Sequence, residues 1–129
     1  MKFHHIGVAC KDINQTIDFV QSVFEISTTS SIVFDSNQNV DLCLLIDKFG
    51  MNIELVCGKK VEKFIKNKQY FYHTCWEVDD LVKSINHFCK KGAIIISEPK
   101  PAILFNNKKV AFLFTEIGIV ELLEKKASL

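Results

Sequence analysis

The fold is indicated by a stretch near the start of the chain, FHHIGVAC at residues 3–10, which recurs as FYHTCWEV at residues 71–78. Both stretches are rich in the aromatic and β-branched residues that buried strands favour. An acidic residue, Asp12 in one copy and Asp80 in the other, follows each stretch and is a good N-cap for a helix. This recurrence, at an offset of 68 residues, indicates an internal repeat.

The residues after each acidic cap continue the repeat. Apolar residues first recur at the three- and four-residue steps of an amphipathic helix. Three strand candidates then follow in each copy, near 26–34, 40–46 and 51–57 and near 93–97, 109–115 and 118–123. We therefore expect a single α+β domain over residues 1–129, built from a βαβββ module at 1–57, a lysine-rich connector at 58–70 and a second βαβββ module at 71–129.

Composition narrows the class of protein. The 129 residues are 48% hydrophobic with a net charge of +1, which excludes a disordered chain and argues against nucleic acid as the main partner. No apolar run is long enough to cross a bilayer, and the first residues lack the layout of a signal peptide. The five cysteines are odd in number and show no paired spacing, so we expect structural thiols and a cytoplasmic location.

Four polar residues interrupt the apolar strands at matching places. Glu54 and Glu121 lie in the closing strands of the two copies, and His5 and His73 lie in the opening strands. A buried carboxylate is costly unless it is paired or binds a metal. Two imidazoles and two carboxylates would suit one divalent ion such as Co²⁺, Mn²⁺, Ni²⁺ or Zn²⁺. The alternative is two core histidines and two glutamates that face solvent.

Several segments resemble the vicinal oxygen chelate superfamily, which includes glyoxalases, bleomycin resistance proteins and dioxygenases. The resemblance is carried by HHIGVA at 4–9, YHTCWEVDDL at 72–81 and GIVELLE at 118–124. Within the superfamily the chain is most similar to methylmalonyl-CoA epimerase and glyoxalase I-like proteins. SEP at 97–99, followed by KKVAFL at 108–113, is epimerase-like.

The resemblance implies a glyoxalase-like fold, in which two tandem βαβββ modules form a curved eight-stranded mixed sheet, or cup, around one divalent metal ion. It implies metal ligands at His5, Glu54, His73 and Glu121, and a homodimer. Epimerases usually carry Gln at the position of Glu54, whereas glyoxalase I usually carries Glu, so this position departs from the epimerase pattern.

The resemblance also implies the chemistry. The metal stabilises an enolate after a carboxylate removes a proton α to a carbonyl. Asp41 matches an acidic base of the epimerases, and Glu121 could serve as both ligand and base. The alternative for Asp41 is a strand-start residue after a turn. The lysines of the connector could meet the phosphates of a CoA thioester, or could simply be solvated.

Three functions follow as hypotheses. The first is a metal-dependent epimerase that acts on a small acyl thioester such as an acyl-CoA. The second is a glyoxalase I-like lactoylglutathione lyase. The third is a non-catalytic protein of the same fold that binds a small molecule, although such proteins typically lack the four metal ligands. None of the three requires a nucleic acid or a membrane as partner.

Overall fold

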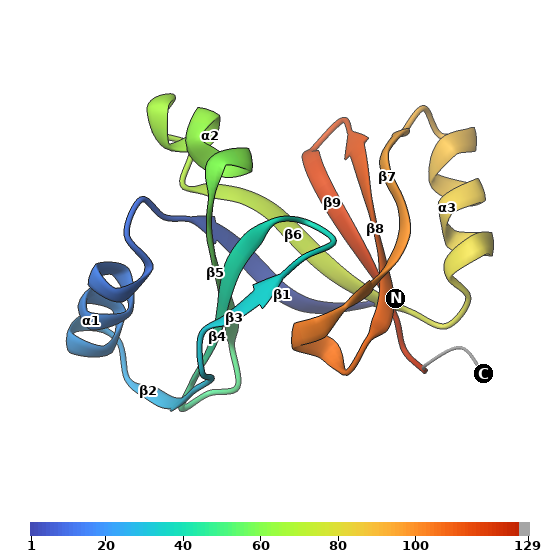
Figure 1. Ribbon diagram of the computed structural model, residues 1–129. Coiled ribbons are helices and arrows are strands. Elements are labelled where there is room, and N and C mark those ends of the chain that lie inside the picture. The colour runs from blue at the N-terminus through green and yellow to red at the C-terminus, as the bar shows by residue number, and fades with distance from the viewer. Residues whose placement is uncertain (127–129) are drawn as a thin grey trace. The chain divides into compact units, whose positions relative to one another are not determined.

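The structure is a computed structural model that describes residues 1–126, and Figure 1 shows the course of the chain. The residues form two compact units. The first unit runs from His5 to Tyr72, and the second unit combines Met1–His4 with the described residues from His73 to Lys126. Among residues 1–126, none of the helices has the length and apolar character that crossing a bilayer would need.

The first unit contains a mixed sheet and the helix α1. Its elements are β1 (Lys2–Ala9, whose first residues belong to the second unit), α1 (Ile13–Val23), β2 (Ile26–Thr29), β3 (Val33–Asp35), β4 (Val40–Asp47), β5 (Asn52–Cys57) and two short helices, η1 (Lys59–Val61) and α2 (Glu62–Lys66). The strands lie in the order β2-β4-β5-β1, and β3 also pairs with β4. β1 and β5 are parallel, whereas β4 is antiparallel to β2, β3 and β5.

The second unit repeats this plan. Its elements are β6 (Phe71–Val78), α3 (Leu81–Lys90), β7 (Ile94–Ala102), the short helix η2 (Ile103–Phe105), β8 (Lys108–Thr115) and β9 (Gly118–Glu124). The strands lie in the order β6-β9-β8-β7. β6 and β9 are parallel, and β8 is antiparallel to both β9 and β7. The predicted α+β class with two βαβββ modules is therefore confirmed.

The strand count differs from the expected eight, because the described residues form nine strands. The predicted strand at 26–34 is two strands, β2 and β3, which pair with different ends of β4. The break begins at Ser30, whose hydroxyl accepts a hydrogen bond from the Leu44 N–H at 2.8 Å. A side chain here takes the place of a backbone partner and ends the β2 ladder.

β7 is longer than predicted, since it continues from the expected 93–97 to Ala102. Its pairing with β8 shifts register twice, and it contains Pro99 and Pro101. Proline is tolerated in this strand because β7 lies at the edge of the sheet, where an N–H is not needed on both sides.

The helices begin where the acidic residues predict. Asp12 accepts a hydrogen bond from the Gln15 N–H at 3.1 Å, and Asp80 accepts one from the Lys83 N–H at 3.0 Å. Both are therefore N-caps, as expected. Gly92 follows the end of α3 with a φ of +99°, a conformation that glycine adopts without strain.

The two longer helices, α1 and α3, each lie against one face of the sheet of their own unit (Figure 1). In the first unit, Ile13 and Val20 of α1 join Cys43, Leu45 and Leu55 in a buried cluster. In the second unit the matching cluster contains residues of α3, β6, β8 and β9: Val78, Leu81, Ile85, Ala111, Leu113, Val120 and Leu122. Each sheet thus has a helix-covered apolar face, and its other face is available for different side chains.

We expect Asp80→Ala to lower the free energy of unfolding by about 1 kcal/mol, because it removes the cap of α3. Asp79→Ala is the matched control. Asp79 is the adjacent, exposed carboxylate, and it lies 3.8 Å from the Lys125 ammonium in a solvent-exposed ion pair, so its loss should cost about 0.3 kcal/mol or less. Chemical denaturation measures both variants, and equal losses would contradict the capping role of Asp80.

Candidate metal centre

The first candidate pair is His5 with Glu54. Glu54 on β5 lies opposite Gly7 on β1, and His5 is two residues before Gly7. Because side chains alternate along a strand, His5 and Glu54 extend from the same face of the sheet. Nε2 of His5 lies 3.4 Å from Oε1 of Glu54. Both side chains are buried, with 0% and 4% of their residue surface exposed.

The second candidate pair, His73 with Glu121, has the same construction. Glu121 on β9 lies opposite Cys75 on β6, and His73 is two residues before Cys75. Nε2 of His73 lies 3.2 Å from Oε1 of Glu121, and both residues are buried. The ring of Phe112, the residue of β8 opposite Glu121, meets the His73 ring edge-on at 5.5 Å between centroids. That contact restricts the orientation of the His73 ring.

The two pairs are equivalent in the repeat. Gly7 and Cys75 occupy matching positions of the opening strands, and each lies opposite the glutamate of its own module. The expectation that these four polar residues are buried, two in each copy, holds for all of them. Both pairs also lie on the sheet face that the helix does not cover, since the alternate residues Leu55 and Leu122 belong to the helix-face clusters.

The chemistry of each pair suits a divalent ion. Two ligands held tetrahedrally about 2.1 Å from one ion lie about 3.4 Å apart. The imidazole nitrogen and carboxylate oxygen of each pair, 3.4 and 3.2 Å apart, are spaced as such ligands are. Nitrogen and oxygen donors together are typical of Zn²⁺, Co²⁺, Ni²⁺ and Mn²⁺ sites. Each pair can thus supply two of the ligands that an ion needs.

Asp41 does not lie with these residues. On β4 it pairs with Cys57 of β5, whereas Glu54 pairs with Leu44. The odd step between them places Asp41 on the α1 face, opposite to the face that carries Glu54. This geometry does not support the expectation that Asp41 acts as a base beside the metal ligands, and it favours the alternative of a residue near the start of a strand.

Asp35 is a buried carboxylate that the sequence analysis missed. It is 1% exposed and pairs with Val40, on the same face as Glu54. Its carboxylate accepts hydrogen bonds from the Asn37 N–H at 2.9 Å and from the backbone N–H and side-chain amide of Gln38 at 3.2 and 3.1 Å. Val40 lies four residues along β4 from Leu44, about 13 Å from the Glu54 row. Asp35 therefore holds a turn, and the signal was an Asp that precedes polar turn residues.

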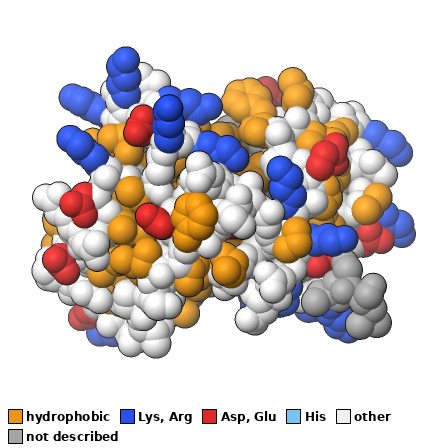
Figure 2. Space-filling model, in the orientation of Figure 1, with side chains coloured by type: hydrophobic (Ala, Val, Ile, Leu, Met, Phe, Trp, Pro, Cys, Tyr) orange, Lys and Arg blue, Asp and Glu red, His pale blue; other side chains and the backbone are white. Residues whose placement is uncertain are grey.

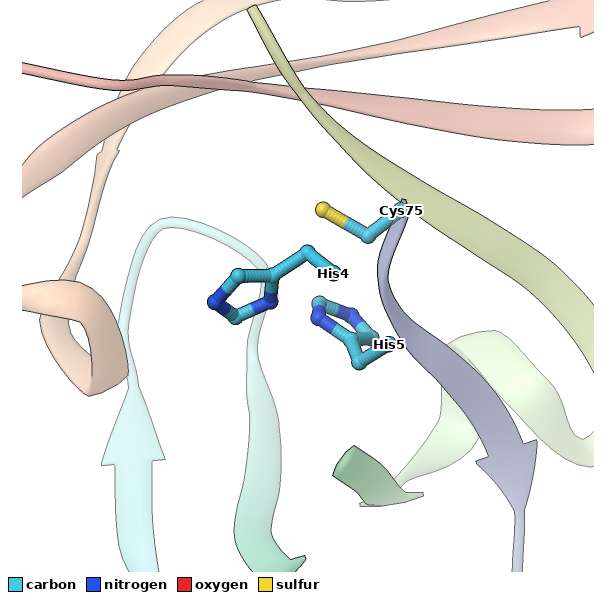
Figure 3. Close-up of side chains that lie close together, drawn as sticks. All are labelled: His4, His5 and Cys75. Atoms are coloured by element: carbon cyan, nitrogen blue, oxygen red, sulfur yellow. The ribbon is translucent and has the colours of Figure 1, made fainter. Parts of the chain in front are cut away.

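Figure 3 shows the neighbourhood of the β1 histidines. His4 and His5 are carried by adjacent residues of β1, and the half-buried His4 ring meets Phe105 edge-on at 5.1 Å between centroids. A ring nitrogen of His4 and the sulfur of Cys75 lie within 4.8 Å of each other. His4 and Cys75 could therefore offer softer donors than the carboxylates do.

The chain matches the family model described as the glyoxalase/bleomycin resistance protein/dioxygenase superfamily over residues 4–112. The match includes His5, Glu54 and His73, and it ends before Glu121. No curated protein sequence matches the chain.

Solved structures show the same fold. A hypothetical protein from Bacillus halodurans C-125 has a TM-score of 0.81 at 24% identity, with 99% of this chain and 96% of that chain covered. Methylmalonyl-CoA epimerase from Mycobacterium tuberculosis has a TM-score of 0.81 at 16% identity, with 97% and 88% covered. For 2,2',3-trihydroxybiphenyl 1,2-dioxygenase from Sphingomonas wittichii strain RW1 the TM-score is 0.64 at 14% identity, with 98% of this chain but 43% of that chain covered.

The buried Asp35 and the half-buried Asp41 should differ in how much each contributes to the stability of the fold. We expect Asp35→Ala to lower the free energy of unfolding by about 2 kcal/mol, because three donors lose a charged acceptor. Asp41→Ala is the control on the neighbouring strand, and we expect a change of about 0.5 kcal/mol or less. Denaturant titration measures both values. A neutral Asp35→Ala would show that the turn does not depend on this carboxylate.

Proposed function

This chain belongs to the glyoxalase/bleomycin resistance protein/dioxygenase superfamily, and we propose that within it the protein is a divalent-metal-dependent isomerase. The proposed reaction removes and returns a proton α to the carbonyl of a small acyl thioester, as an epimerase does. One observation carries the proposal: a buried His–Glu pair occurs twice, in the same register of two modules.

Accident is a poor explanation for this repetition. Burying a carboxylate costs several kcal/mol, and apolar residues of similar volume would stabilise the sheet as well or better. Both modules nevertheless bury a glutamate at the equivalent strand position. Buried titratable groups that structural stability does not require are typical of functional sites.

We propose that His5, Glu54, His73 and Glu121 together bind a single divalent ion. The proposal rests on the equivalence of the two pairs and on the spacing of their donor atoms within each pair. The set of two imidazoles and two carboxylates favours Co²⁺, Mn²⁺, Ni²⁺ or Zn²⁺. The homodimer that the family resemblance implies stays a prediction.

The ion, when bound, supplies positive charge that lowers the free energy of an enolate. The residues of the chain supply positioning and proton transfer. We assign the proton transfer to Glu121, which brings a carboxylate into a buried site beside the restrained His73 ring. A carboxylate in such a site can accept the α-proton and exchange it with solvent. A proton returned to the other face of the planar enolate inverts the carbon.

Asp41 was the second predicted base, and the proposal leaves it out. Its side chain lies on the α1 face, together with Cys57 and away from the face of Glu54.

An anionic acyl thioester fits the surface of the first unit. Figure 2 shows lysine side chains gathered over the η1–α2 segment. These exposed lysines are Lys59, Lys60, Lys63, Lys66 and Lys68. Together they form a basic surface that could attract the phosphates of a CoA group. Methylmalonyl-CoA epimerase is among the proteins of the same fold, which supports this class of substrate.

A second candidate function is that of a glyoxalase I-like lactoylglutathione lyase. Glu54 favours it, because glyoxalase I usually carries Glu where epimerases carry Gln. The lyase reaction and the epimerase reaction both begin with removal of a proton beside a carbonyl. The same residues would therefore act on a glutathione hemithioacetal. The third hypothesis, a non-catalytic binding protein of the same fold, has no observation in its favour beyond the fold itself.

Metal analysis tests the proposed site. Protein purified without chelators should contain about one divalent ion per chain, and His73→Ala should abolish it, because a ligand is lost. His87→Ala is the matched control, since His87 is an exposed histidine of α3. His5→Ala distinguishes the arrangements: a shared ion is lost in either variant, whereas separate ions would fall by half in each. Wild-type protein that stays metal-free during Co²⁺ and Mn²⁺ titration would refute the site.

Solvent exchange tests the reaction. In D₂O, the metal-loaded protein should place deuterium on the α-carbon of methylmalonyl-CoA, and Glu121→Gln should slow this exchange by about 100-fold or more. Asp41→Asn is the control and should exchange at the wild-type rate within about twofold. The metal content of each variant is measured alongside, so that loss of the ion is not mistaken for loss of the base.

The outcomes separate the three hypotheses. Absence of exchange together with turnover of a glutathione hemithioacetal would assign the lyase. Absence of both activities in the metal-loaded protein would contradict catalysis and leave a binding protein. Slow exchange in Asp41→Asn would restore Asp41 to the mechanism.

A further inference from the structure

Two cysteines lie side by side where the strands β1 and β5 end. The parallel pairing runs from Ile6 opposite Ile53 to Ala9 opposite Val56, and one more step brings Cys10 opposite Cys57. The Cys10 N–H donates to the Val56 carbonyl at 2.9 Å, so the ladder does extend to this residue. The second module supports the register, because the equivalent residues Val78 and Glu124 are paired on β6 and β9.

The two thiols are turned toward the same end of the sheet. The sulfur of Cys10 lies 3.5 Å from the Val56 carbonyl oxygen, and the sulfur of Cys57 lies 3.5 Å from the Lys11 carbonyl oxygen. Both cysteines pack with the α1-face cluster, Cys10 fully buried and Cys57 half-buried. Burial, followed by the neighbouring Cys57 thiol, raises the pKa of Cys10 to about 12. The thiols are thus close enough to affect each other.

We propose that Cys10 and Cys57 are an oxidisable dithiol, which peroxides convert to a disulfide between β1 and β5. Neighbouring strands lie about 4.8 Å apart, within the range of Cα separations that disulfides span, roughly 4.4–6.8 Å. The bond therefore needs rotation of two side chains and no change in strand pairing. The proposal is independent of the proposed metal site and its reaction.

The chemistry takes two steps. The half-buried Cys57 is the accessible thiol, and its attack on hydrogen peroxide gives a sulfenic acid and releases water. The sulfur of Cys10 then attacks the sulfenic sulfur, forms the S–S bond and releases a second water. One peroxide is thereby reduced to two waters while two thiols lose two electrons and two protons. A small thiol reductant reverses the bond by exchange.

The remaining cysteines are placed differently. Cys43 is buried on β4, and its thiol donates to the Ser30 carbonyl at 3.4 Å. On the sheet, Cys43 lies opposite Leu55, two residues before Cys57 on β5. Cys75 and Cys89 belong to the second unit. Among the cysteines of the first unit, Cys10 and Cys57 are therefore the pair that the strand register brings opposite each other.

The bond would join the strand that carries His5 to the strand that carries Glu54. It would also close a long loop that contains α1 and β2–β5, which restricts the unfolded chain. The oxidised protein should therefore unfold at a higher temperature than the reduced protein, by several degrees.

Peptide mapping tests the proposal without ambiguity, because trypsin places each cysteine in a separate peptide. The folded protein is treated with hydrogen peroxide, unfolded, alkylated and digested without reductant. We expect residues 3–11 to be joined to residues 49–59, two thiols to be lost per chain, and both changes to reverse with dithiothreitol.

Variants make the test specific. Cys89→Ser should form the same link as the wild type, since Cys89 is a half-buried cysteine of α3. Cys57→Ala should keep all four of its titratable thiols after the same treatment. Cys10→Ala should form no link and lose only the Cys57 thiol, which stops at the sulfenic acid or is oxidised further. Circular dichroism checks that both variants fold. Five titratable thiols in oxidised wild-type protein would overturn the proposal, as would a link between any other two peptides.

Discussion

The parallel pairing of the opening and closing strands of each module is the constraint on which the rest of the structure depends. It sets Glu54 opposite Gly7 and Glu121 opposite Cys75. A slip of one residue would turn each carboxylate onto the helix face, into an apolar cluster. The packing of α1 and α3 on that face therefore stabilises each sheet and also sets the strand register. The register in turn decides which side chains lie on the opposite face.

The energetic roles of the two faces are opposed. The helix face buries apolar side chains, which stabilises each sheet by the usual hydrophobic contribution of about 25 cal/mol per Å². The other face buries a histidine and a glutamate in each module, which reduces that gain. A marginally stable domain tolerates such a reduction only where the apolar clusters offset it. The proposed metal ion would convert this unfavourable feature into binding energy, because an imidazole and a carboxylate are already gathered in each pair.

Much of the fold could be predicted from the sequence, since periodicity and the repeat act at short range. The two caps, Asp12 and Asp80, followed from spacing, whereas spacing left open whether the two glutamates face solvent; the structure buries both of them and both histidines. The face of Asp41 did not, because one residue of register decides it and the register is set by distant pairing. The break at Ser30 depended on a side-chain hydrogen bond that no periodicity reveals.

Comparison of equivalent positions in the two modules indicates which residues the fold requires and which are particular to one module. The His–Glu pair is retained in both modules, so a common function or a common fold requirement could explain it; its energetic cost favours function. The Cys10–Cys57 position differs between the modules, because the second module has Val78 and Glu124 there. There the Glu124 carboxylate accepts a hydrogen bond from the Lys109 N–H at 2.7 Å and stays buried. The strand end is therefore built equally well without thiols. In the first module the two cysteines pack with the α1-face cluster, and the proposed disulfide is a property that Val78 and Glu124 could not share.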